Sequence, residues 1–172
     1  LYGQVALNLD KWTFTAGFRD YEIADGFKSS EFGVFYGGSF GCDGTAPEGT
    51  TCSEENGSES DNRPKFTATY QPNENLTLFA VSSAGYRPGG NNAALPYFCA
   101  NDPEASSFQR RYTSDRAENT EFGIKARGDS FNVNATYFMI DWTDIQIGIA
   151  PACGWSFQAN GGEAETLSLI HI

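Results

Sequence analysis

The residues of this chain that are able to do chemistry do not form a catalytic pattern. Its only histidine, His171, falls in residues 167–172, which match the translation of one reading frame of a widely used transposon-end sequencing adapter. We expect the native sequence to stop near Thr166, so His171 is no candidate base or ligand and a Ser-His-Asp arrangement is excluded. Carboxylate pairs are numerous but have no distinctive spacing. The sequence therefore predicts a protein that is not an enzyme.

Polar and aromatic side chains that could bind a ligand gather just after strand-like segments. Arginine binds a carboxylate or a phosphate through two parallel hydrogen bonds, and tryptophan stacks on sugars and aromatic groups. The candidates are Arg87, Asn91, Asn92, Arg110, Arg111 and Trp155. A structural alternative exists for two of them: Arg87 would order its turn by pairing with a carboxylate, and Trp155 would pack within its loop.

Acidic residues form a second cluster, in a glycine-rich stretch. It consists of Asp43, Glu48, Glu54, Glu55, Glu59 and Asp61. Clustered carboxylates can bind Ca²⁺, but the spacing is not that of an EF-hand. A solvated external loop explains the cluster better, and we predict no metal site and no cofactor.

The four cysteines all fall where loops are expected, which favours an oxidising compartment such as the bacterial periplasm or cell surface. Four cysteines allow three pairings. We favour Cys42 with Cys52, which closes one loop, and Cys99 with Cys153, which joins two loops. Zinc binding is a weaker interpretation because the spacings are not those of zinc sites.

Composition and periodicity favour strands over membrane helices. The 172 residues carry a net charge of −11, which argues against nucleic acid as a partner. No apolar run reaches the roughly 18 residues of a membrane helix. Residues 12–19 and 131–139 alternate between apolar and polar side chains, as strands with one apolar face do.

The lengths of the connections indicate how these strands are arranged. We predict strands at residues 2–9, 12–28 (continuing as a hairpin through 31–40), 65–71, 76–86, 119–127 and 131–149, with a last strand beginning near Asn160. Short polar turns at residues 10–11, 72–75 and 128–130 alternate with long connections at 38–63 and 88–118. Transmembrane β-barrels have short periplasmic turns and longer external loops. The predicted fold is therefore an all-β, antiparallel transmembrane β-barrel.

Several ordered motifs in residues 64–166 resemble the barrel of TonB-dependent outer-membrane receptors of the kind found in sphingomonads. These motifs are LTLFAVSSAGYRPGG at 76–90, ENTEFGIK at 118–125, the aromatic-Asp segment at 138–146, Cys-Gly at 153–154 and NGGEA at 160–164. The sequence departs from the family pattern at Asn119 and Thr120, where a tyrosine commonly precedes the glutamate, and at Asp115, where glutamate is more usual. We expect residues 1–166 to belong to the barrel domain, with residues 1–63 fitting by their strand pattern and not by motif, and residues 167–172 to come from the adapter.

The resemblance implies a barrel of about 22 strands with a plugged lumen, of which this chain supplies about seven. It implies a receptor in the Gram-negative outer membrane that contacts lipid. That receptor takes up a scarce small-molecule nutrient, such as a ferric siderophore or an oligosaccharide, and is driven by the inner-membrane TonB complex through a plug domain outside this chain. The alternatives are a passive porin or adhesin-type barrel and a soluble carbohydrate-binding β-sandwich.

Charged and polar side chains within the predicted strands indicate which face turns to the lumen. Lysine on the lipid face near the midplane costs roughly 2–4 kcal/mol. We therefore predict that Glu121, Lys125, Asp141 and Gln146 face the lumen as structural residues, and that Trp142 anchors at the membrane interface.

Overall fold

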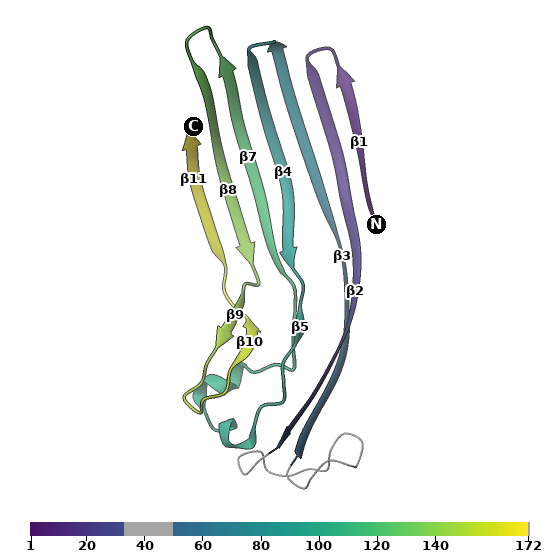
Figure 1. Ribbon diagram of the computed structural model, residues 1–172, viewed down its shortest axis with the longest axis vertical. Coiled ribbons are helices and arrows are strands. Elements are labelled where there is room, and N and C mark those ends of the chain that lie inside the picture. Colours follow the sequence, from purple (N-terminus) through teal and green to yellow (C-terminus); the bar gives the residue numbers. More distant parts are fainter. Residues whose placement is uncertain (33–49, 172) are drawn as a thin grey trace.

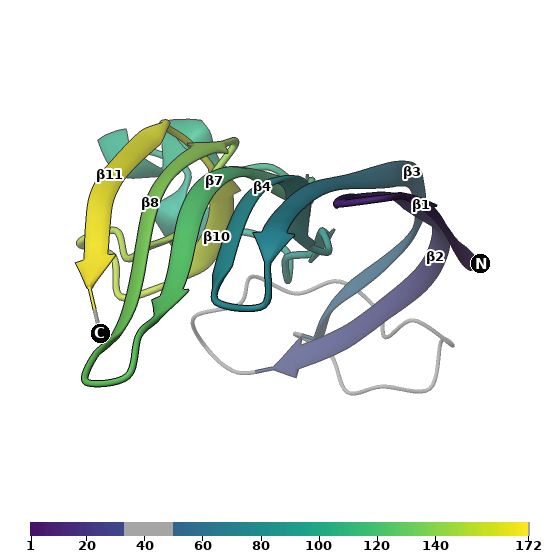
Figure 2. The same ribbon diagram turned by 90° about the horizontal axis from the view of Figure 1, so that it is seen from above.

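The computed structural model describes residues 1–32 and 50–171, and most of these residues belong to antiparallel β-sheet. Seven strands form one sheet in the order β1-β2-β3-β4-β7-β8-β11. They are β1 (Tyr2–Leu9), β2 (Trp12–Phe32), β3 (Thr50–Asn73), β4 (Leu76–Arg87), β7 (Asp115–Arg127), β8 (Asn132–Thr143) and β11 (Ala164–His171) (Figure 1). Seen from above, the sheet is open, with β1 and β11 on opposite sides (Figure 2). The predicted all-β, partial-barrel fold is confirmed.

Short turns join the strands at the upper end of Figure 1. Asp10 in the β1–β2 turn has φ of 52°, a left-handed conformation that aspartate tolerates better than most residues. In the β3–β4 turn the Asn73 side chain accepts a hydrogen bond from the Asn75 N–H at 2.9 Å. The β7–β8 turn closes through the Gly128 N–H, which donates to the Phe131 carbonyl at 2.9 Å. These are the three predicted short turns.

The strand register separates an apolar face from a polar face. One row of directly paired residues crosses the whole apolar face: Leu7, Phe14, Ala68, Ala80, Phe122, Tyr137 and Leu169. The large side chains in this row are 40% to 66% exposed. Exposed apolar area of this kind is favourable against lipid and unfavourable against water.

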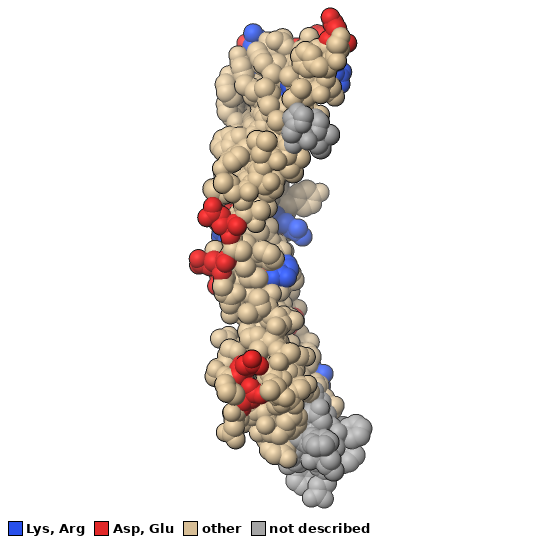
Figure 3. Space-filling model, turned by 90° about the vertical axis from the view of Figure 1, so that its left-hand side faces the viewer, with Lys and Arg blue, Asp and Glu red and all other residues tan. Residues whose placement is uncertain are grey.

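Charge marks the limit of the apolar face toward the lower end of the sheet. Glu118 pairs directly with Asp141, and Asp141 with Glu165, in one row on that face. On the side of the molecule that carries β11, uncharged surface separates charged groups near the upper turns from acidic and basic groups at mid-height and below (Figure 3). The uncharged stretch has the character of a membrane-facing band.

Long connections occupy the opposite end, at the bottom of Figure 1. There β5 (Gly90–Asn91) pairs with β6 (Arg111–Tyr112), and β9 (Gln146–Ile149) pairs with β10 (Phe157–Asn160). Two 3-10 helices, η1 (Tyr97–Cys99) and η2 (Pro103–Ser107), lie between β5 and β6. We call residues 88–114 and 144–163 the knob. Beside it, β2 and β3 extend as one continuous hairpin, paired from Trp12↔Tyr70 to Phe32↔Thr50.

The strands are longer and more interrupted than predicted. β3 begins at Thr50, although residues 65–71 alone have the expected strand composition, because its outer half pairs with β2. The predicted strand 131–149 ends at Thr143, since Asp144 adopts φ of 53° and redirects the chain into β9. The last strand of the main sheet starts at Ala164, after Gly162 at φ of 83°.

No helix in residues 1–32 and 50–171 is long and apolar enough to cross a membrane.

Candidate functional site

The knob is attached to the sheet by a buried carboxylate that holds Arg87. Asp115, at the start of β7, is only 1% exposed. Its carboxylate accepts hydrogen bonds from the Arg87 backbone N–H at 2.8 Å and from Arg87 Nε at 2.6 Å. The Arg87 guanidinium also lies 4.9 Å from the centre of the Trp142 ring. Burial would raise the pKa of Asp115, but hydrogen bonds from Arg87 and Trp142 and the charge of Arg87 together lower it below 3.8.

Gln146 completes this attachment from the other side of the knob. Its side-chain amide donates to three carbonyl oxygens, those of Pro88 at 2.8 Å, Thr113 at 3.1 Å and Arg87 at 3.3 Å. The Arg87 guanidinium donates in turn to the Gln146 carbonyl at 3.2 Å. Arg87 and Gln146 thus fix the two chain segments that enter the knob.

Asn92 joins the two halves of the knob. It is 6% exposed, and its amide nitrogen donates to the carbonyls of Gln109 and Gln158, each at 2.7 Å. Its side-chain oxygen accepts from the Gln158 N–H at 2.9 Å. A side chain this well hydrogen-bonded is held in place by the protein, so the structure places Asn92 inside the knob and not on its surface.

A disulfide between Cys99 and Cys153 links the same two halves, as predicted. Cys99 is fully buried. The Asp102 carboxylate supports the link, because it accepts hydrogen bonds from the N–H of Cys153 and of Glu104, both at 3.1 Å. The predicted partner pair, the Cys42 and Cys52 side chains, lies outside the described residues, as do Asp43 and Glu48 of the acidic cluster.

Arg111 and Asn91 tie the knob to the β2–β3 hairpin. Arg111 forms an ion pair with Asp25 at 2.8 Å, and the Asn91 amide also donates to Asp25. The guanidinium of Arg111 lies against Gly57, where an added Cβ would come within 1.8 Å of it. The Gly89 N–H donates to Glu59 at 3.1 Å. We call the contacts of Arg111, Asn91, Asp25, Gly57 and Glu59 the clasp.

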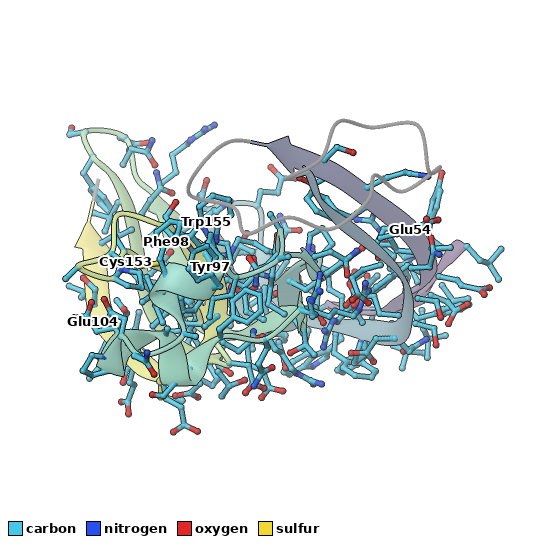
Figure 4. All side chains as sticks on the ribbon, turned by 90° about the horizontal axis from the view of Figure 1, so that it is seen from below. Glu54, Tyr97, Phe98, Glu104, Cys153 and Trp155 are labelled. Atoms are coloured by element: carbon cyan, nitrogen blue, oxygen red, sulfur yellow. A yellow bond between two sulfur atoms is a disulfide. The ribbon has the colours of Figure 1, made fainter. Side chains whose placement is uncertain are left out.

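Of the predicted ligand-contact residues, Arg87 and Arg110 are exposed, Asn91, Arg111 and Trp155 are half-buried, and Asn92 is buried. Arg110 has a 44% exposed side chain and lies 3.6 Å from Glu55. In the view from the loop end, Trp155 lies in the same part of the molecule as Tyr97 and Phe98, away from Glu54 on the hairpin (Figure 4). Tyr97 is 63% exposed. Tyr97 and Phe98 carried no signal in the sequence because aromatic residues in loops are common.

The predicted lumen residues divide between the two faces of the sheet. Glu121 and Lys125 lie on the polar face, where Glu121 accepts a hydrogen bond from Asn119 at 2.6 Å and Lys125 lies 5.6 Å from the Phe79 ring centre. Asp141 does not share that face, which corrects the prediction. It pairs with Glu118 and not with Glu121 or Lys125, and the register places it on the apolar face beyond its uncharged part.

Sequence reasoning missed several structural partners. Asp25, Glu59 and Asn160 bind knob groups, with Asn160 accepting a hydrogen bond from the Thr113 N–H at 2.6 Å. Their strands gave no local signal, since each partner is distant in the sequence. Across the described part of the chain, no group of three or more histidine, cysteine, aspartate or glutamate side chains is arranged to hold a metal ion.

These features together define a class of protein: an open section of an antiparallel barrel wall, apolar on one face, with elaborate structure at one end. A family model described as TonB dependent receptor-like, beta-barrel, matches residues 1–167. The chain therefore belongs to the TonB-dependent receptor family, through its β-barrel. Among curated protein sequences no match was found.

Two solved structures share the fold. The ferric yersiniabactin uptake receptor FyuA from Yersinia pestis superposes with a TM-score of 0.71 at 12% identity, covering 98% of this chain and 22% of that one. The second is the Serratia marcescens hemophore receptor HasR, solved as a double mutant with its hemophore HasA and heme. It superposes with a TM-score of 0.58 at 15% identity, and the match covers 99% of this chain and 30% of that one. The chain thus spans less than a third of either receptor.

Proposed function

We propose that this chain is part of the barrel of an outer-membrane receptor that takes up a scarce nutrient, such as a ferric siderophore or an oligosaccharide, with energy from the TonB complex. The observation that carries the proposal is the match of the family's barrel model to residues 1–167. The exposed apolar face supports a lipid contact, because its large side chains would otherwise meet water. The TonB complex would act through the plug domain of the whole receptor.

In this proposal the knob and the hairpin form part of the external surface that captures the nutrient. The disulfide and the buried Asn92 give the knob a fixed shape. Preorganised surfaces lose less conformational entropy when a ligand binds. Trp155, Tyr97 and Arg110 offer aromatic and cationic contacts at this surface. Arg87, Asn91, Asn92 and Arg111 support it through their hydrogen bonds and ion pairs to neighbouring segments.

Uptake by the whole receptor tests the proposal. The gene that encodes this segment would be deleted in its host, and growth compared on a panel of ferric siderophores, haem and oligosaccharides as sole iron or carbon sources. We expect growth on one nutrient to be lost, restored by the gene, and lost again in a strain without TonB. Growth that needs the gene but not TonB would identify a passive barrel instead, and growth independent of the gene would contradict uptake.

Binding-site variants refine this experiment. Trp155→Ala should raise the nutrient concentration needed for half-maximal uptake without changing the amount of receptor at the cell surface. Ile147→Ala is the control, because Ile147 is an apolar residue of the knob that is 41% exposed. Equal uptake by the two variants would remove Trp155 from the ligand contacts.

A further inference from the structure

Three cationic side chains lie together on the polar face of the β2–β3 hairpin. Arg19 pairs directly with Arg63 across the two strands, and Lys65 lies two residues further along β3 on the same face. Like charges directly opposite each other destabilise a sheet. This concentration is unexpected in a chain with 22 acidic and 11 basic residues.

Arg63 is buried with much of its hydrogen-bonding capacity unused. Its side chain is 5% exposed, and one guanidinium nitrogen pairs with Asp61 at 2.8 Å. The other two nitrogens, Nε and Nη1, are buried and have no hydrogen-bond partner. Leaving buried donors unpaired is costly, more so when the group is charged.

Asp61 neutralises only one of the three charges. In the described part of the chain, Arg19 and Lys65 form no ion pair. The Tyr86 ring offers partial compensation, with the guanidinium carbons of Arg63 and Arg19 at 5.4 Å and 6.0 Å from its centre. Two positive charges therefore remain without a counter-charge.

A pocket of about 610 Å³ opens onto these cations, and its lining includes Arg19, Arg63 and Lys65. Its hollow form has a cause in the sequence, because Gly17 and Gly85 also line it and have no side chains to fill it. Pockets of this size hold small organic ligands. It lies where β3 and β4 stop pairing, after Lys65↔Ser83, and where the two strands diverge in Figure 1.

We propose that this pocket binds an oxyanion, a carboxylate or phosphate group, through Arg19 and Lys65, with Arg63 as a fixed positive charge behind them. Arg19 and Lys65 are exposed and meet the anion directly, and bidentate contact suits the Arg19 guanidinium. The oxyanion belongs either to the transported nutrient or to a carboxylate from another part of the same receptor. The first source rests on the proposed uptake function; the second does not.

The test uses the full-length receptor, purified in detergent at low ionic strength. Equilibrium dialysis with radiolabelled citrate and inorganic phosphate measures binding, and a thermal scan measures the unfolding midpoint. The variants are the double substitution Arg19→Gln/Lys65→Gln and the single Arg63→Gln. Arg127→Gln is the matched control, since Arg127 is an exposed cation on the polar face of β7 near the opposite end of the sheet. Heat-modifiable migration on gels confirms that each variant is folded.

If the nutrient supplies the oxyanion, the wild type binds citrate or phosphate saturably. The double variant then binds at least roughly tenfold more weakly, as expected for loss of hydrogen bonds to a charged group, and Arg127→Gln binds within about twofold of wild type. If the receptor supplies the carboxylate, no added anion binds, and the double variant unfolds at a lower temperature than Arg127→Gln does.

The proposal is overturned if no anion binds and the double variant unfolds at the same temperature as the control or at a higher one. A higher temperature would mean that the pocket is empty, because removing two unpaired positive charges would then relieve repulsion and stabilise the sheet. It is also overturned if all variants bind as the wild type does. Anion binding is measured on purified receptor and nutrient uptake is measured in cells. A negative result for the anion pocket therefore does not contradict the proposed uptake function, and a negative uptake result does not contradict the pocket.

Discussion

The seven-stranded sheet and the knob are held together in opposite ways. The sheet exposes its large apolar side chains, among them Val5 at 73% and Phe122 at 55%. The knob encloses a small interior of its own, with Phe157 at 4% and Cys99 fully buried, although Tyr97 remains exposed. Backbone hydrogen bonds between neighbouring strands hold the sheet, whereas a disulfide, buried polar side chains and packed rings hold the knob.

This difference follows from the surroundings each region is built for. A wall that faces lipid needs apolar side chains outside and complete backbone pairing within. A water-exposed extension needs an interior of its own, and the knob is too small to have a large one, so covalent and polar links supplement it. The sheet should therefore respond to changes on its outer face, and the knob to changes in its internal contacts.

The largest effect is expected from a charge on the apolar face. In the full-length receptor folded into lipid vesicles, Phe122→Lys should lower the free energy of unfolding by about 2–4 kcal/mol, because lysine is poorly solvated in lipid. Denaturant titration measures the change. Thr69→Lys on the polar face is the control and should cost much less; similar losses for both would mean that the two faces are not distinguished by lipid.

The disulfide sets the next effect, and it should be confined to the knob. Replacing Cys99 and Cys153 by alanine should lower the free energy of local opening by about 2–3 kcal/mol, since the link restrains the open state. Hydrogen exchange should show faster exchange in residues 92–113 and 145–160 with no change in β7 and β8. Faster exchange throughout the sheet would show that the two regions are one cooperative unit.

The Arg87–Asp115 contact should make the attachment of the knob depend on pH. Because the pKa of Asp115 is lower in the folded protein than its ordinary value of 3.8, the contact stabilises fully above that value and is lost as the pH falls through the folded pKa. Asp115→Asn should cost about 1.5–3 kcal/mol at neutral pH and abolish this acid sensitivity. Protease digestion of the knob between about pH 2 and 5 provides the measurement, with Asp129→Asn, in the β7–β8 turn, as control. Unchanged acid sensitivity in Asp115→Asn would contradict the assignment.

The smallest effect is expected at the clasp. Arg111→Gln should weaken protection of the outer β2–β3 hairpin by about 1 kcal/mol, and added salt should reduce the difference, because the Arg111–Asp25 pair is partly exposed. Arg116→Gln is the control, since its partner Glu118 is exposed and outside the clasp. Hydrogen exchange of residues 20–30 measures both. A salt-independent loss would indicate packing over Gly57 as the cause instead of charge.

The main sheet was predictable because strands and turns are local. The alternation in residues 12–19 places Phe14 and Phe18 on one face from sequence alone, and Asp10-Lys11 marks the turn before them. The outer half of β3 was not predictable, since residues 50–64 are polar on both faces and become a strand through pairing with β2. The prediction for Asp141 was wrong because it was based on charge alone. The alternation of β8 places Asp141 on the same face as Tyr137, four residues earlier.

In the candidate site, too, some contacts could be predicted from the sequence and others could not. The Cys99–Cys153 link was a choice among a few pairings, and the structure confirms it. The structural role of Asn92 was not accessible, because it depends on Gln158, which is 66 residues away in the sequence. The pairing of Arg111 with Asp25 spans 86 residues, and no local pattern in either segment indicates it.

The sequence by itself determined the period-two alternation, the short turns and the family, because each depends on residues close together in the chain or in a fixed order. Only the tertiary structure decided which polar groups satisfy one another. The knob's attachment, the clasp and the cluster of Arg19, Arg63 and Lys65 arise from strand register and loop packing. Those contacts depend on distances in space between segments that the chain order leaves far apart.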